Sequence, residues 1–595
     1  MIQFFDFEEL IEINNKKCSI VEKYPKMRYL LECVCKDLTL TDNIQFSNLF
    51  SRLDYICEIK RMSKRRKFQI HRFRVNANKV LHSRYEPTEE EYKQDLEALC
   101  NAVSFFYKID IPSALSSIFS KTQDKSPLLR KFKKYDRIRV AVESVDNQFI
   151  YAYDEDCATE EPIKIKYSID FNETIEHLWK GCQLNLIDVI VDVQNIYNPD
   201  IIILEPDYMI DVSSLAECMK DYGKHPLIFV QSKFEAIQKT KDILLGNTAN
   251  FFLDELINDN TVNYEDVIRK AFQSTPFDFS TCNEIDNNFF IEVKTQFHNI
   301  KNVINNVFPQ QEIDRNNAVL EPSFICEQLG VQGRLDFMQI HSNNSGQNTI
   351  IELKSGKAPF PYTDFSKIGL NHQSQAFIYQ IMIQKILKLK FDNLQTYIFY
   401  SKYGVDGSNL RLVRPYMAAI KEILNIRNLI VTNECKIAQD KTGLQTQDTI
   451  TNIKSETLIT GKSLNDRSIP PWVIPDIEKF QSVFKSASEL EIAYFHNFYS
   501  FVTKEHCLSK IGSTDYESNR GLSSLWLSSL EEKKDAGEIL YDLNIIDSKV
   551  DTDDLTLLFN VPEYDEAFLP NFRQGDIVIL YERNADTDKV TNKQI

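Results

Sequence analysis

The stretch GVQGRLDFMQIHSNNSGQNTIIELKSGKAPF, residues 330–360, decides the fold that this sequence predicts. Alternating apolar residues around Asp336 indicate one strand, residues 349–354 indicate a second, and the polar residues between them indicate a turn. Because residues two apart along a strand point to the same face, we expect Asp336, Glu352 and Lys354 to meet on one face of a hairpin.

This trio of side chains has the chemistry of a metal site. Two carboxylates that converge at short range offer oxygen ligands to a hard divalent cation such as Mg²⁺. A lysine beside them can orient or help to deprotonate a metal-bound water and offset the charge of a phosphate. The triplet Glu-x-Lys recurs along the chain and carries no weight alone. Glu352, however, lies between an apolar strand and Gly356, downstream of a Gly-x-x-Asp element at residues 333–336.

A third element follows at NHQSQAFIYQIMIQ, residues 371–384, whose apolar residues have helical spacing. With about 100° between successive residues, His372, Gln375 and Tyr379 fall on one side of this helix and apolar residues cover most of the other. We therefore expect a helix whose polar side lines a cleft.

In order and spacing, Gly-x-x-Asp, Glu-Leu-Lys and His-x-x-Gln-x-x-x-Tyr resemble the PD-(D/E)XK nuclease core of the RecB-type branch, over about residues 285–400. The chain looks most like the nuclease-containing N-terminal part of the eukaryotic-type replication helicase-nuclease family. The resemblance implies a mixed β-sheet flanked by helices, and hydrolysis of DNA phosphodiester bonds with Mg²⁺ or Mn²⁺ as cofactor. It also implies residue roles: metal binding by Asp336, Glu352 and the Leu353 carbonyl, positioning of the attacking water by Lys354, and contacts of Gln375 and Tyr379 with the metal–water network or the DNA backbone.

Two further positions are implied by the resemblance. The family places a histidine on a helix upstream of Gly-x-x-Asp, and His298 matches that position as a further metal ligand. Glu321 corresponds to an acidic position that often precedes the same strand. Many relatives also hold an iron–sulfur cluster with three closely spaced cysteines after these motifs. Only Cys435 and Cys507 follow Tyr379, so no iron–sulfur cluster is expected.

The N-terminal region, residues 1–130, has helical spacing and contains the basic run KRMSKRRKFQIHRFR at residues 60–74. Such a run is usually a solvated face, but its interleaved aromatic residues also suit a surface that holds a DNA backbone and stacks bases. Both interpretations stand. The candidate DNA-binding residues are Lys64, Arg65, Arg66, Lys67, Arg72 and Arg74, with Lys131 and Lys133 in a second basic stretch.

Changes of pattern divide the rest of the chain. Short strand-like runs at residues 131–235 predict an OB-like β-barrel, although a β-domain that only packs against its neighbours fits equally well. Residues 236–435 form the predicted nuclease domain, and the polar residues 436–476 predict a linker. Residues 477–595 predict a helical stalk, and GDIVILYER at 575–583 resembles the start of a helicase-associated β-barrel. The expected fold class is multidomain α/β.

The composition fits a soluble protein of several domains: 595 residues, 43% apolar and 26% charged, with a net charge of −17. The longest apolar runs are far shorter than the roughly 18–20 residues that span a bilayer, and the start lacks a secretory signal. We therefore expect a cytoplasmic protein with no membrane partner. The acidic balance argues weakly against nucleic acid, but an average over the chain hides its basic stretches.

Together these features predict a metal-dependent nuclease that cleaves single-stranded or flap DNA, as the nuclease part of a helicase-nuclease in DNA replication or repair. Its helicase motor would lie in a missing C-terminal part or in a separate chain. One alternative is a non-catalytic DNA-binding subunit with a degenerate nuclease fold. Another is a phage-defence nuclease with the same chemistry.

Overall fold

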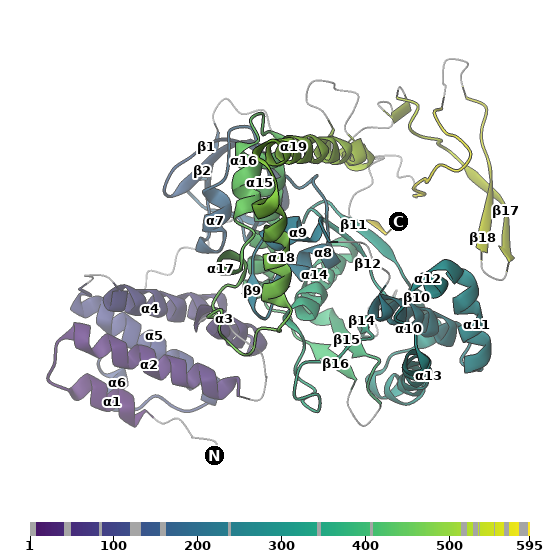
Figure 1. Ribbon diagram of the computed structural model, residues 1–595. Helices are drawn as coiled ribbons and strands as arrows, with labels where there is room; N and C mark the ends of the chain where they lie inside the picture. Colours follow the sequence, from purple (N-terminus) through teal and green to yellow (C-terminus); the bar gives the residue numbers. More distant parts are fainter. Residues whose placement is uncertain are drawn as a thin grey trace. The chain divides into compact units, whose positions relative to one another are not determined.

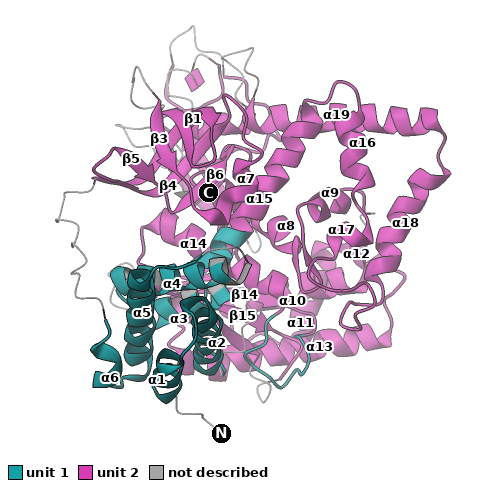
Figure 2. Cartoon of the chain, turned by 90° about the vertical axis from the view of Figure 1, so that its left-hand side faces the viewer, with its two compact units in different colours: residues 1–132, 358–368, 414–422 teal, residues 133–357, 369–413, 423–595 magenta. Residues whose placement is uncertain are grey.

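The computed structural model of the chain describes residues 7–40, 49–82, 86–119, 133–154, 162–235, 240–341, 347–404, 409–512, 521–527, 533–534, 536–551, 554–564, 570–581 and 593–594. Its helices and strands make a multidomain α/β protein (Figure 1). The chain divides into two compact units (Figure 2). Unit 1 comprises residues 1–132, 358–368 and 414–422, and unit 2 comprises residues 133–357, 369–413 and 423–595.

Unit 1 contains the helices expected of the N-terminal region. Its core is formed by buried residues such as Leu31, Phe73 and Leu99. A capping box, in which Thr88 and Glu91 each bond the other's backbone N–H, starts the fifth helix. The helices are α1 (Glu8–Asn15), α2 (Ile20–Leu38), α3 (Leu49–Ile59), α4 (Lys64–His82), α5 (Glu89–Tyr107) and α6 (Ser113–Ser116).

Unit 2 begins with a closed β-barrel, which confirms the barrel predicted for this region. Its strands are β1 (Lys133–Val145), β2 (Phe149–Asp154), β3 (Ile163–Lys166), β4 (Gln183–Val191) and β5 (Ile196–Asn198). They follow the order β1-β2-β3-β5-β4, and antiparallel pairing of β1 with β4 closes the ring. Alternate residues such as Val140, Ile150 and Ile165 are buried inside it. The helix α7 (Asn172–Ile175) connects β3 to β4, and β6 (Ile201–Leu204) also pairs with β4.

A second sheet of unit 2 contains the predicted hairpin. Its strands lie in the order β10 (Ala318–Leu320), β13 (Phe337–Gln339), β14 (Asn348–Lys354), β15 (Leu394–Tyr400) and β16 (Leu410–Val413). β13 and β14 are antiparallel, with Phe337 opposite Ile351, whereas β14 and β15 are parallel. The hairpin is therefore confirmed, and the sheet is mixed.

Helices cover both faces of this mixed sheet. On one face, α10 (Lys241–Asn258) and α13 (Asn287–Asn302) share a hydrophobic core with Ile351, Leu353 and Phe399. The short helices α11 (Tyr264–Ser274) and α12 (Pro276–Thr281) extend that core through Val267 and Phe279. The other face carries α14 (Leu370–Leu387), the helix predicted at residues 371–384.

A smaller sheet leads the chain toward Asp336. β7 (Ile210–Asp211) pairs in parallel with β12 (Val331–Arg334), which is antiparallel to β11 (Ser323–Cys326). β11 also pairs with β19 (Lys593–Gln594). Between β7 and α10 lie α8 (Val212–Glu217), β8 (Met219–Lys220), β9 (Gly223–Lys224) and α9 (Leu227–Ser232).

The polar segment 436–476 is not the linker that its composition predicts. It holds the end of α15 (Met417–Ala438), then α16 (Leu444–Thr451) and α17 (Ser455–Leu458), and it shares a hydrophobic core with α18 (Val473–Ser486) and α19 (Glu489–Ile511). The segment contributes the buried residues Ile437, Ile450, Ile453, Leu458, Ile459 and Ile469. A few apolar side chains at suitable spacing anchor it although its average composition is polar.

The C-terminal part confirms the helices α18 and α19 but differs in its strands. Its other described elements are α20 (Ser524–Leu527) and the antiparallel hairpin of β17 (Asn544–Asp551) and β18 (Asp554–Asn560). Residues 576–581, which resemble the start of a β-barrel in sequence, form no strand. Within the described part of the chain no strand pairs with this stretch, and Ile577 is fully exposed.

Candidate active site

β14 presents its side chains alternately to the two faces of the mixed sheet. Ile351 and Leu353 enter the core with α10 and α13, so Glu352 and Lys354 point to the opposite face, where α14 lies. The Glu352 side chain is buried, and that of Lys354 is 21% exposed. The alternation in the sequence thus places these two charged groups side by side.

Gln375 of α14 completes this cluster. The Lys354 Nζ donates to Glu352 Oε1 at 3.0 Å and to Gln375 Oε1 at 2.8 Å. Gln375 Nε2 donates to the same Glu352 oxygen at 2.6 Å and to Ser213 Oγ of α8 at 3.2 Å. Each of the three side chains is fixed by the other two, and the ammonium group is held against the carboxylate.

Asp336, just before β13, joins the cluster through the backbone of β14. Its Oδ2 accepts a hydrogen bond from Leu353 N at 2.6 Å, and its Oδ1 accepts one from Asn250 Nδ2 at 3.3 Å. Burial and the neighbouring Glu352 carboxylate raise the pKa of Asp336 well above its ordinary value, against the opposing effect of Lys354. The expected convergence of Asp336, Glu352 and Lys354 is confirmed. Two carboxylates share one lysine, so a cation would relieve their repulsion.

Tyr379, one turn after Gln375, contacts the Gly-x-x-Asp element. Its hydroxyl donates to the Arg334 carbonyl oxygen at 2.8 Å. A Cβ on Gly333 would lie 2.9 Å from the Tyr379 ring, so the glycine leaves the space that the ring occupies. Tyr379 therefore supports the strand that leads into Asp336.

The sequence predicts that the polar side of α14 lines a cleft. In the structure this side of α14 is buried. Residues 374–384 of α14 are all buried. His372 Nδ1 lies 2.9 Å from the Tyr400 hydroxyl oxygen, and burial, followed by Lys354 and Lys220, lowers the pKa of His372 to about 3. The polar groups of α14 are used for internal hydrogen bonds, because protein covers this side of the helix as well.

Among the described contacts, none joins His298, the histidine predicted as a metal ligand, to this cluster. His298 is exposed on α13, whereas Gln296 of the same helix turns inward and donates from Nε2 to the Ser355 carbonyl oxygen at 3.1 Å. The rotation of α13 about its axis, set by the buried Phe297, turns His298 to solvent.

The residues that do meet at Asp336 suit a hard cation. Glu352 Oε2 and Asn250 Oδ1 are buried, and neither has a hydrogen-bond partner among the described residues. Buried acceptors are normally paired in native proteins. Carboxylate and amide oxygens are the ligands that Mg²⁺ and Ca²⁺ take. Asp336 and Glu352 could therefore hold such an ion, with Leu353 contributing its carbonyl as the resemblance implies.

A pocket of about 350 Å³ adjoins this cluster and is lined mainly by α10, α11 and α12. It contains Asp254, one turn after Asn250, together with Glu321 and Arg334, whose side chains form an ion pair at 3.2 Å. The Glu321 N–H also donates to the Asp336 carbonyl oxygen at 3.2 Å, so this acidic position does lie beside the site. Sequence patterns mark neither Asn250 nor Asp254, because α10 carries no recognisable spacing of ligand residues.

Asp254 makes the stability of the fold depend on pH. Burial, and then the Glu321 carboxylate, raise the pKa of Asp254 to about 7 from 3.8, with Arg334 opposing. Between about pH 4 and pH 7 the folded protein therefore binds a proton at Asp254 that the unfolded chain lacks. The contribution of this proton to the free energy of unfolding is fully present below about pH 4 and is lost as the pH rises through 7.

We expect Asp254→Asn, which is neutral at every pH, to raise the melting temperature relative to the unsubstituted chain at about pH 8 and to change it little at about pH 4. Thermal unfolding at the two pH values measures the difference. An equal shift at both values would contradict the assignment.

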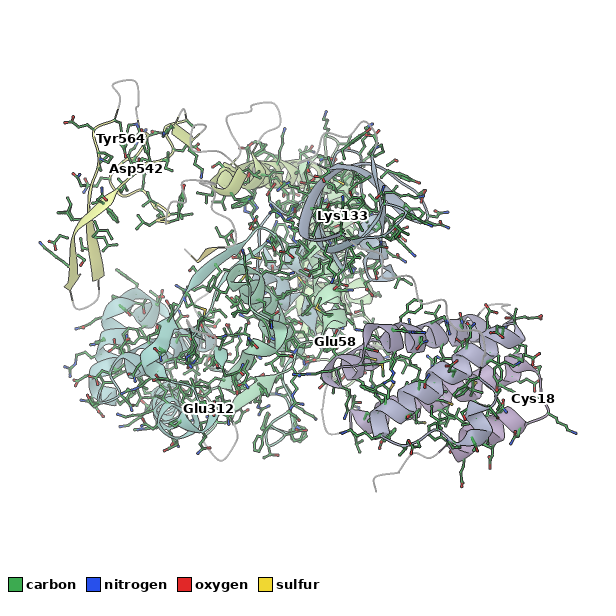
Figure 3. The ribbon with its side chains drawn as sticks, turned by 180° about the vertical axis from the view of Figure 1, so that it is seen from behind. Cys18, Glu58, Lys133, Glu312, Asp542 and Tyr564 are labelled. Carbon is green, nitrogen blue, oxygen red and sulfur yellow. The ribbon has the colours of Figure 1, made fainter. Side chains whose placement is uncertain are left out.

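The basic run of unit 1 is partly engaged in contacts within the unit. Glu58 of α3 is labelled in Figure 3. Lys67 pairs with Glu58 at 3.4 Å, Arg72 pairs with the buried Asp95 at 3.4 Å, and Arg66 lies 5.5 Å from the Phe105 ring centre. Part of the run therefore supports the helical core, and a role of its exposed residues in DNA binding stays a prediction. Of the other candidates, Arg65 and Lys133 are exposed and Arg74 is half-buried, whereas the Lys64 side chain and Lys131 lie outside the described residues.

Comparisons with known proteins add no relative: no protein-family model matches the chain, and no curated protein matches it. Within the ranges that the structure describes, no helix combines the length and apolar character needed to cross a membrane.

Proposed function

We propose that the chain is a metal-dependent deoxyribonuclease of the PD-(D/E)XK superfamily. The observation that carries this proposal is the meeting of Asp336, Glu352 and Lys354 at one end of a β-hairpin, with Gln375 of α14 bonded to two of them. A cation bound there supplies a polarised water and charge stabilisation for phosphodiester hydrolysis.

The side chains have separate tasks in this proposal. Asp336 and Glu352 offer the oxygens that bind the cation, and the Leu353 N–H fixes the orientation of the Asp336 carboxylate. Lys354, held between Glu352 and Gln375, positions the attacking water and stabilises negative charge on the phosphate. Gln375 orients Lys354, and Tyr379 holds the strand before Asp336.

We infer that the barrel is an OB-fold that guides a single DNA strand. Its strand order and the helix between β3 and β4 support this inference. On β2, the side chains of Phe149, Tyr151 and Tyr153 alternate with buried residues and so face outward, opposite Lys164 and Lys166 of β3. Aromatic rings and cations in this arrangement stack bases and contact phosphates.

Removal of the two tyrosines tests this role of the barrel. Replacing Tyr151 and Tyr153 together by alanine is expected to weaken binding of a single-stranded oligonucleotide by at least about tenfold, since each stacked base contributes about 1–3 kcal/mol. Fluorescence anisotropy measures the affinity. Ile169→Ala, at a 75% exposed position in the connection between β3 and β4, is the control that should bind normally. Equal affinity of the double variant would exclude this face.

A cleavage assay tests the proposed activity itself. Single-stranded, double-stranded and flapped DNA, labelled at either end in turn, are incubated with the full chain and Mg²⁺ or Mn²⁺, or with EDTA. We expect metal-dependent cleavage, with single-stranded or flap DNA preferred. Binding of DNA without cleavage under all these conditions would overturn the proposal in favour of a non-catalytic subunit.

The resemblance alone supports a role in DNA replication or repair together with a helicase motor.

A further inference from the structure

The pocket beside Asp336 has the size and the position of a ligand site. Its volume of about 350 Å³ falls in the range of about 300–1,000 Å³ that small-molecule sites span. Two residues that line it, Asn250 and Arg334, connect it to Asp336: Asn250 Nδ2 donates to Asp336 Oδ1 at 3.3 Å, and Arg334 lies two residues before Asp336 in the chain. A group bound in this pocket would therefore lie next to the proposed site of hydrolysis.

One face of α10 supplies an aromatic ring and two polar side chains to this pocket. Asn247, Phe251 and Asp254 are four and three residues apart, so they follow one another along a single face of the helix. Phe251 and Asp254 are half-buried, and Asn247 is exposed. An aromatic ring with hydrogen-bonding groups on either side of it is the combination that holds a nucleobase, by stacking and by contacts to the edge of the base.

The charges of the pocket favour a base over a phosphate. Its lining holds two carboxyl groups, those of Asp254 and Glu321, against the single guanidinium of Arg334. Arg334 already pairs with Glu321 at 3.2 Å, and the Asp254 carboxyl forms no hydrogen bond with another described residue. A half-buried acceptor of this kind is stabilised by an N–H donor. A phosphodiester has no such donor, whereas cytosine, adenine and guanine carry amino groups.

The turn that leads to Asp336 holds Glu321 at this pocket. Glu321 has a φ of 47°, in the left-handed region that residues with a side chain rarely adopt. Its N–H donates to the Asp336 carbonyl oxygen at 3.2 Å, which fixes it in this conformation. Such conformations cluster at functional sites. The ion pair that compensates Arg334 is therefore built into the same turn that presents Asp336.

We propose that this pocket binds the base of one nucleotide beside the cleaved bond, stacked on Phe251 and hydrogen-bonded by Asn247 and Asp254. This proposal rests on the proposed function, because it takes the ligand to be part of a DNA strand that is hydrolysed at Asp336 and Glu352. A base enters such a pocket only when it is unpaired and unstacked. The pocket thus selects single-stranded DNA at one fixed position of the strand.

A strand with one abasic residue tests the pocket, because an abasic residue lacks its base and keeps its phosphate. A strand of deoxycytidine residues with one internal abasic residue is labelled at one end and cleaved by the full chain with Mg²⁺, and the products are separated at the resolution of one nucleotide. We expect cleavage of one bond, at a fixed distance from the abasic residue, to fall by at least about tenfold relative to the intact strand, as the loss of a stacked base does.

Two substitutions assign that loss to the pocket. Phe251→Leu removes the ring and keeps an apolar side chain against the core, and Asp254→Ala removes the acceptor. Each is expected to lower cleavage of the intact strand toward that of the abasic strand, so that the abasic effect shrinks to less than about threefold. Asn258→Ala, at an exposed position at the end of the same helix, is the matched control and should keep the full effect. Asp254 lies outside the apolar core, so its variant decides the matter should Phe251→Leu fail to fold.

The outcomes separate this proposal from the proposed function. Cleavage by the unsubstituted chain that does not depend on the position of the abasic residue overturns the base pocket and leaves the nuclease. An abasic effect of unchanged size in Asp254→Ala and Phe251→Leu does the same, because the base is then held elsewhere. Absence of any cleavage by the unsubstituted chain overturns both the nuclease and the pocket.

Discussion

Lys354→Ala is expected to slow DNA cleavage by about 10²–10⁴-fold, the range lost when a group that assists proton transfer is removed. Among the described residues, the Lys354 ammonium is the one cation bonded to the Glu352–Gln375 pair, at 3.0 and 2.8 Å. Alanine removes the group that positions the water and leaves the carboxylates in place. Affinity for DNA should stay largely intact, because Lys354 is one of many contacts to the strand. Single-turnover cleavage of an end-labelled single-stranded oligonucleotide and fluorescence anisotropy measure the two quantities.

Lys390→Ala is the matched control for this experiment. Lys390 is exposed just after α14, so its removal deletes the same charge without touching the cluster. It should cleave at the normal rate. Normal cleavage by Lys354→Ala would exclude Lys354 from the reaction, and equal loss in both variants would attribute the effect to net charge.

The parts of the site that the sequence predicts are those set by local periodicity. Alternation along residues 349–354 fixes which side chains share a face of a strand, so the pairing of Glu352 with Lys354 follows without knowledge of the tertiary structure. The hairpin then places Asp336 beside Leu353. The helical spacing of residues 371–384 places Gln375 on the polar side of the helix, where it contacts Lys354. Each of these steps needs only short-range geometry.

The parts that the sequence misses depend on how elements pack. His298 and Asn250 both lie on helices against the same face of the sheet, and only the rotation of each helix about its axis decides which one faces Asp336. The contacts of the basic run 60–74 also depend on packing, because its partners Glu58 and Asp95 lie outside the run in sequence. A pattern of charges in the sequence does not show which basic residues pair with acidic residues of the same chain.

Long-range packing also supports the strand before Asp336, through Arg427 of α15. The Arg427 side chain is fully buried, and its guanidinium donates to the carbonyl oxygens of Gly330, Leu204, Glu205 and Tyr208. Burial lowers the pKa of Arg427 to about 10, so it remains charged at neutral pH. Gly330 has φ of 62°, and a Cβ there would collide with the guanidinium, so glycine is required at this contact.

Arg427→Met is therefore expected to destabilise the protein by about 3–5 kcal/mol, at the upper end for single substitutions, because it breaks a buried hydrogen-bond network around a charged donor. Methionine fills much of the same volume but removes the charged donor from all four carbonyl oxygens, of which those of Gly330 and Glu205 keep a backbone donor in Ile210 N and Tyr208 N. The midpoint of thermal unfolding measures the loss, and Lys436→Met, at an exposed position of the same helix, should change stability by no more than about 0.5 kcal/mol. Gly330 immediately precedes β12, and β12 ends two residues before Asp336. Equal midpoints for Arg427→Met and the control would show that this strand keeps its place without Arg427.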